Sequence, residues 1–208
     1  MTRDFSNINR YLDELVVDIY PQPEDENHSI WMERFIDELP LDYETVLDIG
    51  CGQGYSSYLF GLKSKKWVGV TLGEDYKVCK NRNLEVYCLD FSFLNRFDDG
   101  FFDLLFCRHV LEHSPMPLLT LMEWRRVSKR YLAVVLPSPK EFKYFGRNHY
   151  SVMNNTQFLW LAARAGWHAI LKDYTEPMEL RYVLEKAEPR IEYPHESETD
   201  FINEYGEV

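Results

Sequence analysis

Val46-Leu47-Asp48-Ile49-Gly50-Cys51-Gly52-Gln53-Gly54 runs from an apolar segment directly into three alternating glycines. The apolar segment predicts a buried strand that carries Asp48 to the edge of a sheet. Glycines have no Cβ, so backbone N–H groups in this turn can approach a ligand closely. The helix expected next has four apolar residues spaced for one face: Tyr55, Tyr58, Leu59 and Leu62. Strand, glycine turn and helix together predict the ligand-binding βα corner of a doubly wound sheet.

The rest of the chain alternates between strand-like and helix-like segments. Compact apolar runs predict strands near residues 45–49, 66–71, 85–89, 102–107 and 131–136. This alternation indicates parallel strands joined by right-handed crossovers. Two further strands, expected at 167–174 and 180–188, are separated by a short connection and should therefore pair antiparallel. The expected fold class is α/β, with a doubly wound, mostly parallel sheet that ends in an antiparallel C-terminal strand pair.

Three regions are expected along the chain. Residues 1–40 read as N-terminal helices that cap the site, and residues 41–190 read as the ligand-binding domain. Residues 191–208 carry six acidic side chains and neither Lys nor Arg, so this tail has too little apolar surface to offset the entropy of ordering. We therefore expect a mobile acidic tail. The polar segment 24–28 is either a lid over the site or a plain surface loop.

Composition narrows the classes of partner. The 208 residues carry a formal net charge of −11, which disfavours broad binding to nucleic-acid phosphates. No apolar run approaches the roughly 20 residues that a membrane span requires. The first residues also lack the pattern of a secretion signal. We therefore expect a cytoplasmic protein without a membrane span. Nucleic acid is an unfavoured partner, and the sequence indicates no particular oligomeric state.

The spacing of the glycines separates two classes of ligand. Dinucleotide enzymes carry G-x-G-x-x-G, but Tyr55 stands where the third glycine would be. The pattern D-x-G-x-G-x-G, starting at Asp48, resembles motif I of the class I S-adenosylmethionine-dependent methyltransferases, a Rossmann-like, seven-stranded family. The resemblance implies that residues 41–190 bind S-adenosylmethionine and that the loop passes under its amino-acid part. The contacts implied at this loop are Asp48, Gly50, Cys51, Gly52 and Gly54.

The resemblance continues along the next two strands. Family members usually end the second strand with an acid that accepts both ribose hydroxyls, whereas this chain has Thr71 and Leu72 there. That variant is similar to the cyclopropane-synthase and sterol-methylating branch, in which the pair lies against the adenosine. Glu74 is then either a ribose contact or a first-turn acid favoured by the helix dipole. The third strand leads to Asp90-Phe91, the family position for adenine contacts, and the resemblance adds Arg108.

The segment Cys107-Arg108-His109-Val110-Leu111-Glu112-His113 has two interpretations. H-x-x-E-H is also the pattern of a zinc-peptidase helix, in which two histidines one turn apart bind the metal. That interpretation requires a long helix, but Pro115 and Pro117 follow at once, and no third ligand is obvious. The segment instead resembles the L-x-H-x-x-D/E-P turn of small-molecule and lipid-quinone methyltransferases. The sequence therefore predicts a βα turn and no metal site.

The resemblance implies methyl transfer from S-adenosylmethionine to an unidentified small-molecule or protein acceptor. Because the sulfonium already activates the methyl group, the enzyme mainly aligns the reactants and excludes water. If the acceptor must lose a proton, the candidate general bases are His109, His113 and His149. Two alternatives stay open: a non-catalytic binding module with the methyltransferase fold and, less favoured, a dinucleotide-binding oxidoreductase.

Overall fold

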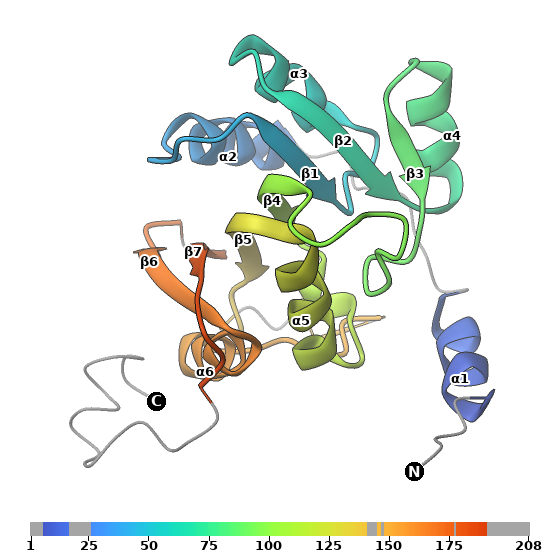
Figure 1. Ribbon diagram of the computed structural model, residues 1–208, viewed down its shortest axis with the longest axis vertical. Coiled ribbons are helices and arrows are strands. Elements are labelled where there is room, and N and C mark those ends of the chain that lie inside the picture. Colours follow the sequence, from blue (N-terminus) through green and yellow to red (C-terminus); the bar gives the residue numbers. More distant parts are fainter. Residues whose placement is uncertain (1–5, 17–25, 141–144, 147, 177, 191–208) are drawn as a thin grey trace.

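The computed structural model describes residues 6–16, 26–140, 145–146, 148–176 and 178–190 (Figure 1). Its centre is a seven-stranded sheet in the order β3-β2-β1-β4-β5-β7-β6. The strands are β1 (Thr45–Ile49), β2 (Lys66–Thr71), β3 (Val86–Cys88), β4 (Phe102–Arg108), β5 (Ser128–Pro137), β6 (Trp167–Asp173) and β7 (Glu179–Lys186). The helices are α1 (Ser6–Val16), α2 (Glu26–Asp37), α3 (Tyr55–Leu62), α4 (Gly73–Asn81), α5 (Pro117–Val127) and α6 (Asn155–Ala165), with a short 3-10 helix at Leu111–His113.

The strand directions confirm the predicted fold class. β1 pairs parallel with β2 and β4, and β2–β3 and β4–β5 are also parallel. β7 pairs antiparallel with both β5 and β6. All seven expected strands are present, although β5 begins three residues earlier than the apolar pattern indicated, at Ser128. The strand order reverses at β1, which has β2 on one side and β4 on the other, and ligands of such sheets bind beside this switch point.

Helices cover both faces of the sheet, as a doubly wound fold requires (Figure 1). Alternate residues of β4 point to opposite faces because side chains along a strand have a period of two. Leu104 and Phe106 pack with Phe35 and Phe60 of α2 and α3. Leu105 packs on the other face, in a cluster that includes buried side chains of α5 and α6. The sheet is thus held between two apolar layers, and its strand tips are fixed relative to each other.

The predicted inward face of α3 was wrong. Tyr58 and Leu62 are exposed, whereas the buried positions of this helix are Ser56, Leu59 and Phe60. Ser56 turns inward because its hydroxyl donates a hydrogen bond to the Asp48 carboxylate. That polar contact at the first turn sets the rotation of the helix, which an apolar pattern does not reveal.

The two N-terminal helices differ in how they contact the domain. α2 buries Met32, Phe35 and Ile36 against the domain. The described side chains of α1 are exposed or half-buried, and Figure 1 shows this helix apart from the sheet. Residues 24 and 25 of the candidate lid and the acidic tail 191–208 lie outside the described residues. No helix in the described ranges is both long and apolar enough to cross a membrane.

A capping box begins α6 and supports a stability prediction. The Asn154 side chain accepts from the Gln157 N–H at 2.8 Å, and the Gln157 side chain accepts from the Asn154 N–H at 3.1 Å. We expect Asn154→Ala to lower the free energy of unfolding by about 1 kcal/mol, the usual loss for an N-cap. Asn81→Ala, which removes the same amide from the exposed last residue of α4, is the control. Equal midpoints for both variants in urea would contradict the role of the cap.

Candidate active site

A cavity of about 290 Å³ lies at the carboxyl ends of β1, β2 and β4. Its walls come from the glycine turn after β1, the start of α4, and the turn after β4. The loop before α6 adds Asn148 and His149, and α2 adds Met32. Because the three strand ends meet at one edge of the sheet, residues far apart in sequence share this cavity.

The glycine turn has the backbone conformation that its composition predicted. Gly50 and Gly52 have φ values of +70° and +52°, where an L-residue is strained by roughly 1–2 kcal/mol. A Cβ on Gly50 would also collide with the side chain of Val110. The N–H groups of Gly50 and Cys51 donate to the Val70 carbonyl at 2.8 and 3.0 Å, which ties the turn to β2. Gly50, Cys51 and Gly52 all line the cavity.

Asp48 is a buried carboxylate at the floor of this turn. It accepts hydrogen bonds from the Ser56 hydroxyl and, at 3.4 Å, from the Trp67 indole N–H. Burial raises the pKa of Asp48 to about 7, although both hydrogen bonds act in the opposite direction. A carboxyl with this pKa is poised to ionise near neutral pH when a positive charge is placed beside it.

Five residues at or after the ends of β2 and β3 form the next wall of the cavity: Thr71, Leu72, Asp75, Leu89 and Phe91. Glu74, which was expected to be either a ribose contact or a first-turn acid favoured by the helix dipole, is exposed and pairs with Lys77. Its neighbour Asp75 is buried and lines the cavity instead. The two acids stand side by side in the first turn of α4, so only the rotation of the helix distinguishes them.

Two further predicted contacts lie outside the cavity lining. Asp90 accepts from the Ser92 N–H at 2.8 Å and so stabilises its own turn. Gly54 is the N-cap of α3 and packs against Leu84, whose side chain a Cβ would meet. The lining therefore contains eight of the eleven predicted cofactor contacts: Asp48, Gly50, Cys51, Gly52, Thr71, Leu72, Phe91 and Arg108. It also contains Met32, Ser56 and Asp75, which the sequence analysis missed.

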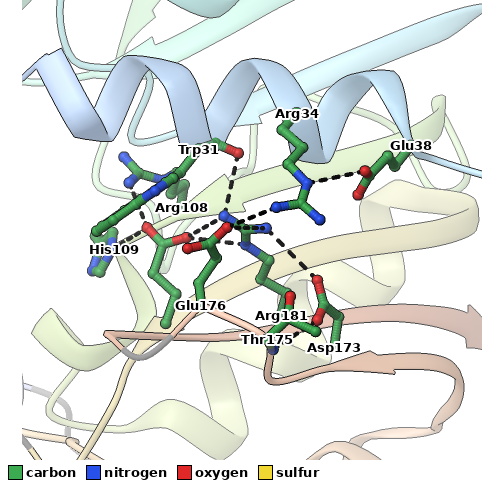
Figure 2. A network of polar contacts seen from close by, with 10 residues as sticks. Trp31, Arg34, Glu38, Arg108, His109, Asp173, Thr175, Glu176 and Arg181 are labelled. Carbon is green, nitrogen blue, oxygen red and sulfur yellow. Dashed lines mark hydrogen bonds and ion pairs between the residues drawn. The ribbon is translucent and has the colours of Figure 1, made fainter.

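A network of buried charges fixes the turn after β4 (Figure 2). Arg108 and His109 both contact the Oε1 atom of Glu179, the first residue of β7. The Arg181 guanidinium, also fully buried, binds the other oxygen of Glu179 at 3.0 Å. Burial would raise the pKa of Glu179, but the His109 hydrogen bond and the neighbouring cations lower it to about 2. Glu179 is therefore ionised and joins the cavity wall to the antiparallel end of the sheet.

His109 is held by carboxylates on both sides. Its Nε2 lies 3.1 Å from Glu179 and its Nδ1 lies 3.3 Å from Glu112. Burial lowers the pKa of His109, but the two carboxylates outweigh this effect and the net direction is upward. The residue has φ +53°, an uncommon backbone conformation outside glycine, which the packed surroundings maintain.

His113 and His149 face each other across the same end of the cavity. Their ring centroids are 4.6 Å apart, with an angle of 76° between the rings. The Nδ1 of His113 lies 3.0 Å from the side-chain oxygen of Asn148 and 3.2 Å from its carbonyl. Burial lowers the pKa of His113 below its ordinary value. All three predicted histidines thus line one cavity, in different electrostatic surroundings.

Part of the chain matches a known family model, and the whole fold resembles solved structures. Residues 47–132 match the family model described as a methyltransferase domain. No curated protein sequence matches the chain significantly. The PH0226 protein of Pyrococcus horikoshii superposes with a TM-score of 0.67 at 16% identity, over 80% of this chain and 94% of that chain.

Two more solved structures have the same architecture. A SAM-dependent methyltransferase from Archaeoglobus fulgidus gives a TM-score of 0.64 at 17% identity, over 77% of this chain and 94% of that chain. The [4+2]-cyclase SpnF gives 0.65 at 14% identity, over 88% of this chain and 93% of that chain. At such identities the likeness concerns the fold. Residues 47–132 thus match a methyltransferase domain, and the seven-stranded sheet has the fold of these solved structures.

Proposed function

We propose that this chain transfers the methyl group of S-adenosylmethionine to an oxygen or nitrogen nucleophile of a small molecule. The observation that carries the proposal is that one cavity is lined by the glycine turn and Asp48 and also by His113 and His149. We call the part beside the glycine turn and Asp48 the first end, for the cofactor, and the part beside the two histidines the second end, for the acceptor. A nucleophile at the histidine end therefore shares one space with a cofactor seated over the glycine turn.

The first end fits the cofactor in shape and charge. Gly52 leaves room for a ligand directly above the backbone, and Asp48 supplies a carboxylate for the cofactor's ammonium group. The side chains of Leu72, Leu89 and Phe91 offer apolar surface for the flat adenine base. The Asp75 carboxylate lies in the same wall and can accept hydrogen bonds from the hydroxyl groups of the cofactor. When bound, the cofactor supplies a methyl group already activated by its sulfonium, so the S–CH₃ bond breaks as the bond to the acceptor forms.

The second end favours a small, polar acceptor. The whole cavity of about 290 Å³ is near the lower limit of ordinary small-molecule sites, and the cofactor would share it, so little space is left for an acceptor. Its walls carry the rings of His113 and His149 and the buried side chain of Asn148. His109 is unsuited to take the acceptor's proton because carboxylates face both of its nitrogens. We therefore assign His109 a positioning role and place the acceptor against the other two histidines.

Methyl transfer is tested with purified chain, methyl-labelled S-adenosylmethionine and a cell extract separated by size. The proposal expects labelled product in the low-mass fraction, with matching formation of S-adenosylhomocysteine. Label in the protein fraction would identify a protein acceptor and overturn the small-molecule assignment. Cofactor binding without turnover in any fraction would favour a binding module. Turnover must be measured because a fold relative carries the name of a cyclase.

The glycine turn gives the first prediction for cofactor binding. We expect Gly52→Ala to weaken S-adenosylhomocysteine binding at least about tenfold, because the new methyl group enters ligand space from a residue with positive φ. Gly61→Ala is the matched control, since a Cβ there has no atom within 4 Å. Calorimetry measures both affinities. Equal affinities for the two variants would show that the cofactor does not lie over this turn.

The pKa of Asp48 gives a second prediction. With a pKa of about 7, Asp48 is mostly protonated at pH 6 and mostly ionised at pH 8. If only the ionised form binds the cofactor's ammonium group, affinity for S-adenosylhomocysteine falls about tenfold from pH 8 to pH 6. Asp48→Asn should bind more weakly at pH 8 and should lose this pH dependence. An unchanged slope in the variant would assign the titration to another group.

A further inference from the structure

Glu112 is a buried carboxylate whose surroundings do not satisfy it. The residue has no exposed surface, and its contact with the Nδ1 atom of His109, at 3.3 Å, has the distance of an ion pair. Apart from that contact, neither carboxylate oxygen has a hydrogen-bond partner in the described part of the chain. Burying a carboxylate without hydrogen bonds is costly, so this position favours an additional cation.

Two histidines complete a compact cluster around this carboxylate. One possible ligand atom from each of Glu112, His113 and His149 lies within 4.8 Å of the other two. Zinc-to-ligand bonds of about 2.1 Å place neighbouring ligand atoms about 3.4 Å apart in a tetrahedral site. Small rotations of the two half-buried imidazole rings would close this difference. His113 and His149 also line the cavity, so the cluster opens towards the proposed acceptor position.

Asn148 orients one of these rings as outer-shell partners of metal ligands do. The carbonyl of Asn148 can only accept a hydrogen bond, so the His113 Nδ1 beside it carries the proton. The lone pair of that ring is then on Nε2, the nitrogen available to a metal ion. Asn148 directly precedes His149 in the chain. One loop therefore supplies both the partner of the His113 ring and the second imidazole.

We propose that Glu112, His113 and His149 bind one divalent transition-metal ion at the acceptor end of the cavity. Two imidazoles and one carboxylate suit ions such as Zn²⁺ better than Mg²⁺ or Ca²⁺, which prefer oxygen ligands. Three protein ligands leave a position open to the cavity. An acceptor oxygen or nitrogen bound there loses its proton more readily, which makes it a better nucleophile. This role rests on the proposed methyl transfer, whereas the site itself does not.

The structure explains why the sequence predicted no metal site. The zinc interpretation required His109 and His113 on one long helix, but β4 ends at Arg108 and only a short 3-10 helix follows. In the folded chain, the group of possible metal ligands around His113 contains Glu112 and not His109. The third ligand, His149, comes from a loop 36 positions later and was not recognisable by spacing.

The test measures metal binding by the full chain after treatment with a chelator. We expect one equivalent of Zn²⁺ or Co²⁺ to bind in calorimetry, with a Co²⁺ absorption spectrum typical of nitrogen and oxygen ligands and no comparable binding of Mg²⁺. Loss of an outer-shell partner already costs about 10–100-fold in affinity, so His113→Gln and His149→Gln should each cost more. His168→Gln, at an exposed position of β6, is the control and should bind as the wild type does.

The outcomes distinguish this proposal from the proposed function. Absence of Zn²⁺ and Co²⁺ binding, or binding unchanged in both His113→Gln and His149→Gln, overturns the metal site. Affinity for S-adenosylhomocysteine is measured in the same variants, and retained affinity shows that the fold and the cofactor end are intact. Failure of the wild type to bind S-adenosylhomocysteine would overturn the proposed function. The metal-binding measurement would still test the metal site, because it does not depend on the cofactor.

Discussion

The register of β1 against its two neighbours sets the positions of the strand tips that line the cavity. Ile49 lies opposite Val70 of β2 and Cys107 of β4, so the residues that follow these three emerge together at one edge. Those residues are Gly50, Thr71 and Arg108, and all of them line the cavity. A shift of one residue would turn each strand's side chains to the opposite face. The apolar layers on both faces prevent such a shift, so the core also maintains the geometry of the site.

This dependence explains which parts of the site the sequence could predict. Strand tips follow from apolar runs and glycines, so Gly52, Thr71 and Arg108 were correctly expected at one place. Side chains on helices depend on rotation about the helix axis, which short segments specify weakly. For that reason the sequence did not indicate that Asp75, and not its neighbour Glu74, faces the cavity. The inward face of α3 failed similarly, because a hydrogen bond from Ser56, and not apolar spacing, sets its rotation.

The charged wall of the cavity depends on partners that are distant in sequence. Glu179 lies opposite Pro137 in the antiparallel pairing of β5 with β7, and this register brings it to the tips of β4 and β5. There it binds Arg108 and His109, which are 71 and 70 positions away in the sequence, and also Arg181, two residues further along β7. Loss of one member would leave a buried charge without its partner, which is usually more costly than the pair is stabilising. The antiparallel strand pair thus supports the site as well as closing the sheet.

The two ends of the cavity have different origins in the fold. The proposed cofactor end is built from strand tips and first helical turns, which the sheet constrains. The proposed acceptor end depends on the loop before α6, where Asn148 and His149 add their side chains to those of the turn after β4. A loop can change its residues without altering the strand register, so one fold can keep a cofactor site while its acceptors differ. The identity of the acceptor is therefore to be sought in contacts with Asn148 and His149.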